Sequence, residues 1–144
     1  MSDADRDELL IVDGMNVLGS RPDGWWRDRP AAMERLTRRL RAYAEREDRA
    51  VAVVFDGREH ERVSAAAGPV TVGFAPGGPN AADREIVRMI RADEQPERIV
   101  AASSDRRLRN SVKAAGARGI GAGEVLRMLE RSEAGGDDAE AGEG

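Results

Sequence analysis

The chain has 144 residues, of which 40% are hydrophobic and 35% charged, and its formal net charge is −4. This length suits one folded domain with a core several layers deep. Because there is no cysteine and only one histidine, disulfides, thiolate sites and imidazole-rich metal sites are excluded, and any metal must be held by oxygen ligands.

The first segment in chain order, residues 1–8, is acidic. It holds four acids and one arginine and has no apolar run, so it does not have the pattern of a signal peptide. No apolar run elsewhere approaches the roughly 20 residues of a membrane helix. We therefore expect a cytoplasmic protein with an acidic N-terminal extension.

From Leu9 onward, short apolar runs alternate with helical patterns. LLIV (9–12), VAVVF (51–55) and RIVAA (98–102) are typical of buried parallel strands, and VTVGF (70–74) and RGI (118–120) are weaker candidates. Apolar residues at helical spacing predict helices within 33–43, 83–90, 108–115 and 125–129. This alternation predicts a three-layer α/β/α sandwich with a mostly parallel central sheet.

The last segment, residues 132–144, is Gly-rich and acidic and has no apolar periodicity, so it is predicted to be a disordered tail. It holds five acids and no base. Together with the acids and the arginine of residues 1–8, this leaves 22 of 23 bases and 18 of 27 acids in the predicted domain, 9–131. The domain is therefore basic by about four charges, although the whole chain is acidic.

Three predicted strands end in a carboxylate. Asp13 directly follows LLIV, Asp56 directly follows VAVVF, and Asp105 follows RIVAA after two serines. A fourth acid, Asp83, begins the second helix on the face that carries Ile86. Because ligands of open parallel sheets bind outside the carboxyl ends of the strands, we expect the four carboxylates to converge at one edge.

Each acid also has a structural interpretation. Asp105 suits a helix N-terminus, Asn80 and Asp83 resemble a capping box, and Asp56 precedes a glycine and suits a turn. Four carboxylates at one edge, however, would repel one another and raise one another's pKa. A divalent cation would relieve that repulsion, so the sequence favours a Mg²⁺ or Mn²⁺ site made of these four acids.

Oxygen-only sites of this kind act mostly on phosphates, which makes hydrolysis of a phosphodiester the expected reaction, with one cation or two. Asn16, one turn after Asp13, is a candidate to orient a water or a phosphate oxygen, or else a turn residue. Ser104 is a candidate to donate a hydrogen bond to a carboxylate or phosphate, or else an N-cap.

Four blocks of sequence carry a family resemblance. VDGMNV (12–17), VVFDG (53–57), NAADREIVRMI (80–90) and ASSDRRLRNSVKAAGA (102–117) follow the order seen in NYN-domain proteins, a branch of the PIN-like ribonucleases. The chain resembles the YacP-like members over about residues 9–131. The resemblance implies a PIN-like fold and Mg²⁺- or Mn²⁺-dependent endoribonuclease activity on RNA, with a ribosome or an RNA-processing assembly as a candidate partner.

The resemblance also implies site residues. The acidic site of the family falls on Asp13, Asp56, Asp83 and Asp105, and its strand-one asparagine falls on Asn16. Two positions depart from the family pattern: Ala81 stands where threonine is common, and Arg84 stands where a further acid sometimes occurs. A missing acid would weaken the binding of a second metal.

The loop GWWRDRP (24–30) leaves the edge that carries Asp13. Trp25 and Trp26 are candidates to stack on unpaired bases, at about 1–3 kcal/mol per base, and Arg27 is a candidate to meet a phosphate. Because adjacent residues rarely share a face, we expect one tryptophan to be buried and the other exposed.

Two further basic features remain open. Segment 57–69 is predicted to be a mobile substrate loop that carries Arg58, and His60 on it is interpreted as a packing or surface residue. Arg106, Arg109 and Lys113 form a basic stripe on the third helix, which a solvated face and RNA contact explain equally well.

Two other functions compete with the nuclease. One is an RNA-binding module of the same fold that lacks catalysis. The other is a haloacid-dehalogenase-like phosphatase with Asp13 as nucleophile, which needs a second aspartate two residues later. Met15 occupies that position, so the phosphatase is set aside.

Overall fold

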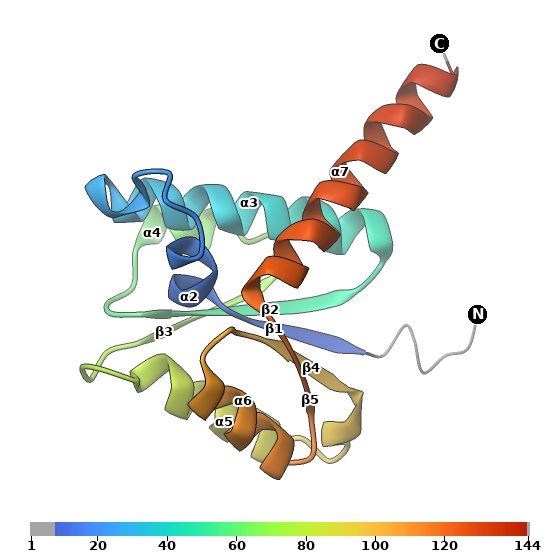
Figure 1. Cartoon of the computed structure of the whole chain (residues 1–144). Coiled ribbons are helices and arrows are strands. Elements are labelled where there is room, and N and C mark those ends of the chain that lie inside the picture. Colours follow the sequence, from blue (N-terminus) through green and yellow to red (C-terminus); the bar gives the residue numbers. More distant parts are fainter. Residues whose placement is uncertain (1–7, 144) are drawn as a thin grey trace.

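The computed structural model describes residues 8–143, and for 136–143 it describes the backbone alone. Five parallel strands form the central layer of a three-layer sandwich (Figure 1). They are β1 (Leu9–Asp13), β2 (Ala50–Asp56), β3 (Thr71–Ala75), β4 (Ile99–Ala102) and β5 (Arg118–Ile120). The predicted fold class and all five predicted strands are confirmed.

Helices cover both faces of the sheet. One face carries α2 (Gly14–Gly19), α3 (Arg29–Glu47), α4 (Glu61–Ala65) and α7 (Ala122–Glu143), and the other carries α5 (Ala81–Ala92) and α6 (Arg106–Ala114) (Figure 1). Two short 3-10 turns, η1 (Trp25–Arg27) and η2 (Pro96–Arg98), complete the elements.

The strand order is β3-β2-β1-β4-β5. From β1 the chain moves outward to β3, returns past β1 to β4, and then continues to β5. Because crossovers between parallel strands are nearly always right-handed, this reversal of direction changes the face that the helices cover. The two directions part between β1 and β4, and the carboxyl end of such a switch point is where open α/β sheets bind ligands.

The apolar run of β1 is explained by burial on both faces. Leu10 and Val12 pack in the cluster under α3 and α7, whereas Ile11 packs in the cluster under α5 and α6. A half-exposed strand would alternate apolar and polar residues, but a central parallel strand needs apolar residues throughout. The strand ends at Asp13, which is 5% exposed.

Two short helices lie where the sequence predicted none. The loop expected after Asp13 begins with α2, and α4 lies within the segment 57–69 that was predicted to be a mobile loop. Val63 of α4 is completely buried in the core. The prediction of a mobile loop is therefore wrong for the α4 part, because one buried valine anchors a helix too short to show periodicity.

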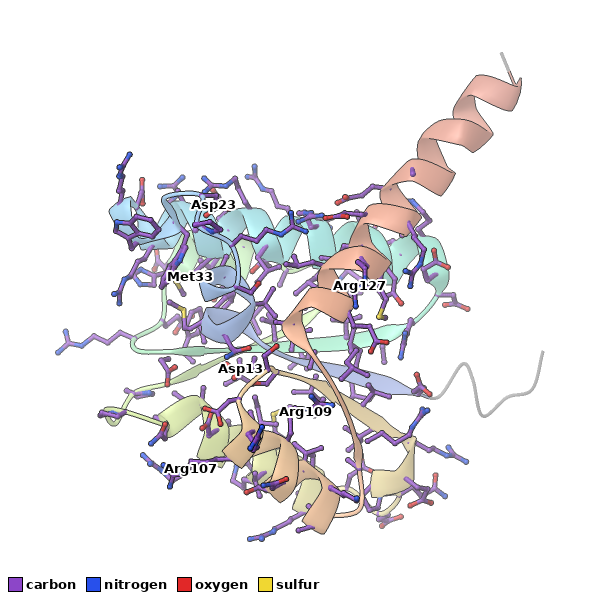
Figure 2. All side chains as sticks on the ribbon, viewed as in Figure 1. Asp13, Asp23, Met33, Arg107, Arg109 and Arg127 are labelled. Atoms are coloured by element: carbon purple, nitrogen blue, oxygen red, sulfur yellow. The ribbon has the colours of Figure 1, made fainter. Side chains whose placement is uncertain are left out.

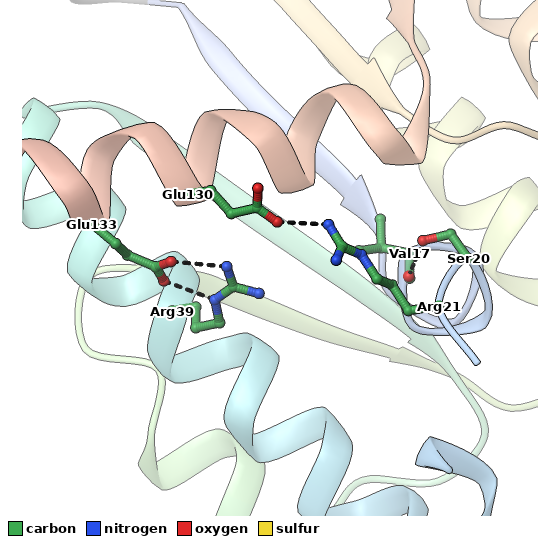
Figure 3. Close-up of polar contacts among 6 residues, drawn as sticks. All are labelled: Val17, Ser20, Arg21, Arg39, Glu130 and Glu133. Carbon is green, nitrogen blue, oxygen red and sulfur yellow. Dashed lines mark hydrogen bonds and ion pairs between the residues drawn. The ribbon is translucent and has the colours of Figure 1, made fainter. Parts of the chain in front are cut away.

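The C-terminal helix extends past the predicted domain boundary at Arg131. Ser132 is buried, and Glu133 accepts two hydrogen bonds from Arg39 of α3, at 2.7 and 2.9 Å (Figure 3). Arg21 donates to Glu130 at 2.6 Å, which ties α7 to the segment after α2. These ion pairs anchor α7 as far as Glu133, and its backbone stays helical to Glu143, where a disordered tail was predicted from residue 132.

At the other end, Glu8 was assigned to the acidic extension but belongs to the fold. Its carboxylate pairs with Arg49 after α3 and with Arg118 of β5. The rest of that predicted extension, residues 1–7, lies outside the described residues. Within residues 8–143, no helix combines the length and the apolar character that a membrane span requires.

Candidate active site

Asp13 lies at the centre of the site, between the two helical layers (Figure 2). It is the last residue of β1, and Ser103, the first residue after β4, donates its hydroxyl proton to Asp13 Oδ2 at 2.9 Å. The Asp105 N–H in turn donates to Ser103 Oγ at 3.1 Å. This chain of hydrogen bonds joins the carboxyl ends of the two strands at the switch point.

Asn16 and Ser104 form a second link across the same gap. The Ser104 N–H donates to Asn16 Oδ1 at 2.8 Å, and Ser104 Oγ accepts the Ala122 N–H of α7 at 2.9 Å. Both side chains thus hold α2, the β4 end and α7 together. The structure supports positioning roles for them, and direct contacts to water or phosphate stay predictions.

Asp56, at the end of β2, binds the N-terminus of α5. The Ala82 N–H donates to Asp56 Oδ1 at 3.0 Å. Asn80, the N-cap residue, has a left-handed backbone (φ 66°) and makes no side-chain capping bond. The predicted capping box is therefore wrong, because Asp56 from a different strand supplies the acceptor.

Asp105 caps α6 in the way that its structural interpretation predicted. Its Oδ1 accepts the N–H groups of Arg107 at 2.8 Å and Leu108 at 3.2 Å. Asp83 differs from the other acids, because it is half-buried in the first turn of α5 and accepts no described hydrogen bond. The four acids thus come from the ends of β1 and β2, the N-cap of α6 and the first turn of α5.

Burial and the charges of neighbouring carboxylates perturb Asp13 and Asp83. Burial, together with the nearby carboxylates of Asp83 and Asp56, raises the pKa of Asp13 to about 6, against the lowering effect of its hydrogen bonds from Ser103 and the Asn16 backbone. Burial also raises the pKa of Asp83, and the charges of Asp105 and Asp56 add to that effect. This mutual perturbation is the behaviour of a cluster and is frequent at functional sites.

The four carboxylates do not surround a common point. Among the described residues, no group of three or more acidic or histidine side chains is placed to hold a metal ion. At Asp56 and Asp105, however, the described hydrogen bonds go to Oδ1, and Oδ2 has no described partner. Hydrogen bonds that orient one oxygen of a ligating carboxylate are a common support of metal sites, so the donor set fits an oxygen-ligated divalent cation.

A cavity of about 570 Å³ lies beside Asp83, between α5 and α6. Its floor includes the apolar side chains of Val87 and Leu108, and four arginines from the two helices line it: Arg84, Arg88, Arg91 and Arg107. An acid next to several cations and an apolar surface suits an anionic, partly apolar ligand such as a nucleotide.

The family model of the YacP-like NYN domain matches residues 10–142. The chain belongs to this family. A crystal structure of Rae1 (YacP) from Bacillus subtilis is similar, with a TM-score of 0.74 and 25% sequence identity over 93% of this chain and 80% of that one. A mutant form of the same protein gives a TM-score of 0.72 and 27% identity over 88% and 77%. No curated protein sequence matches the chain.

In this YacP-like NYN domain, the two tryptophans lie on the 3-10 turn η1, between α2 and α3 in the chain. Trp26 is 51% exposed, and Trp25 is half-buried in a hollow between α2, α3 and α7. The two rings meet edge to face, with their centroids 6.3 Å apart, and the Arg27 guanidinium lies 6.0 Å from the Trp26 ring centroid. None of the three lines the cavity beside Asp83, so their contact with RNA stays a prediction.

Arg58 is exposed two residues after the end of β2 and has no described contact, so its role also stays a prediction. The His60 ring lies edge-on to Phe74, with centroids 6.4 Å apart, which fits the packing role expected for it. Sequence reasoning missed Ser103. Its only signal was its place as the first polar residue after a buried strand.

For hydrolysis of RNA at this edge, the activity that the sequence predicts, replacing Ser103 by alanine should lower the rate by about 10–100-fold without a matching change in KM, the range found for residues that orient metal ligands. Loss of its hydrogen bond raises the pKa of Asp13 further, so the acid side of the pH–rate profile should move to higher pH. Steady-state rates between pH 5 and 8 test this. Ser20→Ala, whose hydroxyl bonds only the local Val17 carbonyl, is the control and should leave the profile unchanged.

Proposed function

We propose that the protein is a metal-dependent endoribonuclease that hydrolyses phosphodiester bonds of RNA at the carboxyl edge of β1, β2 and β4. The observation that carries the proposal is the buried Asp13 at the switch point, whose pKa is raised mainly by burial and further by the neighbouring carboxylates of Asp83 and Asp56. Membership of the YacP-like NYN family supports an RNA substrate. The arginine-lined cavity beside Asp83 supports binding of a phosphate.

The role proposed for each residue follows from its contacts. Mg²⁺ or Mn²⁺ would be held by Asp13, Asp56, Asp83 and Asp105. When bound, the cation supplies charge to polarise a phosphoryl oxygen and to acidify a water. Ser103 orients the Asp13 carboxylate, and Asn16 and Ser104 hold the β4 loop against α2. Arg84 and Arg107, which face Asp83, stabilise negative charge on the RNA.

A second candidate function is an RNA-binding module without catalysis. It is favoured by the absence, among the described residues, of a ready-made group of three metal ligands, and by Arg84 at a position where the family sometimes has an acid. In such a module the same arginines would bind RNA, and the acids would have a structural role without catalysis.

The test is cleavage of labelled single-stranded and structured RNAs with Mg²⁺, with Mn²⁺ and with chelator. We expect cleavage with metal by the unmodified protein and by Asp48→Asn, a control at the end of α3, and none by Asp13→Asn. Cleavage that persists in chelator or in Asp13→Asn would overturn the nuclease proposal. RNA binding without cleavage in either metal would establish the module.

Metal binding has a separate readout. Mn²⁺ should raise the Tm of the unmodified protein and of Asp48→Asn, because a ligand that binds only the folded state stabilises it. Asp13→Asn should lose most of that increase. The cytoplasmic location, expected because the sequence has no signal-peptide or membrane-helix pattern, stays a prediction. A ribosome or an RNA-processing assembly as a partner also stays a prediction.

A further inference from the structure

A groove of about 680 Å³ lies on the far side of α6 from the cavity beside Asp83. Its lining comes from α6, from the loop before it and from β5, and contains no acid. The cations that line it are Arg106, Arg109, Lys113 and Arg118. From this groove we infer that the protein holds the sugar–phosphate backbone of a single RNA strand between α6 and β5, beside the acid cluster. The inference deepens the proposed RNA function and rests on it for the identity of the polyanion.

Three cations of this groove lack a described acidic partner and gather around one hollow. Some surface arginines elsewhere are paired with acids, as in Arg21–Glu130, Arg41–Glu45 and Arg88–Glu85, whereas others, such as Arg58, are not. In the groove, Arg106, Arg109 and Lys113 have no described ion pair or side-chain hydrogen bond, and Arg118 is partly neutralised by Glu8. Three unpaired cations around one hollow attract a polyanion more strongly than a mixed surface would.

The shape of the groove suits an extended backbone. Arg106, Arg109 and Lys113 are spaced at i, i+3 and i+7 and therefore follow one face of α6 over about 10 Å. This length spans about three charges of a stacked strand, which has one phosphate per roughly 3.4 Å. The floor is formed by the small residues Ala117 and Gly119, and Arg109 lies over Gly119 with its Nε 3.6 Å from where a Cβ would stand.

The groove reaches the acid cluster at Ser104. This residue lines the groove, its N–H donates to Asn16, and Asp105 follows it in the chain. A strand that lies along α6 therefore passes the carboxyl end of β4, where Ser103 contacts Asp13. The groove is thus placed to fix the register of the RNA relative to the site.

The experiment measures binding of a short labelled single-stranded RNA in chelator, so that cleavage plays no part. It compares the unmodified protein with the triple variant Arg106→Ala, Arg109→Ala, Lys113→Ala. We expect at least about a tenfold loss of affinity near 0.1 M salt, and a slope of log K against log[salt] that is smaller by about 2, since each lost phosphate contact removes about 0.7. Alanine favours helix, so α6 should stay folded, and the Tm checks this.

The control variant removes the same charge from the opposite layer: Arg38→Ala, Arg41→Ala and Arg131→Ala, on α3 and α7. It should keep the slope of the unmodified protein. An equal loss in both triple variants, or no change of slope in the α6 variant, would overturn the inference. Competition by inorganic phosphate as strong as by unlabelled RNA would overturn it as well, since it would indicate a small-anion site.

Failure of the groove and failure of the nuclease are distinguishable. If the protein never cleaves RNA but the salt dependence of RNA binding is weaker in the α6 variant, the groove is supported and the nuclease proposal is wrong. If the protein cleaves RNA in Mn²⁺ but the α6 variant binds RNA like the unmodified protein, the inference about the groove is wrong and the nuclease proposal is supported.

Discussion

Replacing Asp13 by asparagine should abolish RNA cleavage and at the same time make the protein more stable. The ionised Asp13 carboxylate is buried and repelled by Asp83 and Asp56, which raises its pKa to about 6 from an ordinary value near 4. This difference of about two units corresponds to up to about 3 kcal/mol of destabilisation at neutral pH. Asparagine removes the charge and keeps an oxygen for Ser103, so a gain of about 1–3 kcal/mol is expected, with a loss of activity of at least about a hundredfold.

The gain should depend on pH in a defined direction. Below about pH 4 the Asp13 carboxyl is protonated in the folded and the unfolded chain, so it does not lower the free energy of unfolding at those pH values. Between about pH 4 and 6 the unfolded chain releases the proton while the folded chain keeps it, and the stability of the unmodified protein falls as pH rises. Urea unfolding at pH 4 and pH 7.5 tests this. The account would be contradicted if Asp13→Asn were more stable than the unmodified protein by the same amount at both pH values, or if it were no more stable at pH 7.5.

Replacing Gly14 by alanine should destabilise the fold by about 2–3 kcal/mol, the usual cost of overpacking a core. A Cβ at this position would lie 2.4 Å from two ring carbons of Phe55 and 3.1 Å from the Val54 carbonyl oxygen. Phe55 is completely buried and cannot turn away freely. Because Gly14 follows Asp13 directly, relief of the clash must shift α2 and the site with it.

The matched control is Gly19→Ala at the other end of α2. The nearest atom to its Cβ would be in the Trp25 ring at 3.7 Å, an ordinary contact, and its backbone angles are normal for a helix. Alanine there should be neutral or stabilising by up to about 1 kcal/mol. Chemical denaturation of both variants separates the effect of space at Gly14 from the general effect of replacing a helical glycine.

The fold and the place of the site could be predicted from the sequence because they follow from local patterns. Buried strands such as β1 and β2 are continuous apolar runs. Because parallel strands end at the same edge of the sheet, Asp13 and Asp56 were expected at one edge. The amphipathic periods of α3 and α5 likewise mark their buried faces.

The hydrogen bonds within the site could not be predicted, because they depend on how distant elements pack. Ser103 and Ser104 are adjacent and chemically identical, yet only Ser103 contacts Asp13. Asp56 replaces Asn80 as the acceptor for α5 only because the end of β2 lies beside the start of that helix. Short helices such as α2 and α4 are equally hidden, since five or six residues do not establish a period.

The hydrogen bonds at the switch point join residues that are far apart along the chain: Ser103 to Asp13 spans 90 positions and Ser104 to Asn16 spans 88. Neither bond can exist before β4 docks beside β1, and contacts of such long sequence separation form late and slowly in folding. The hydrogen bond from Ser103, which lowers the pKa of Asp13, is therefore made only in the step that also buries the apolar residues of β4. In a folding experiment, the environment of Asp13 would thus report completion of the sheet rather than its nucleation.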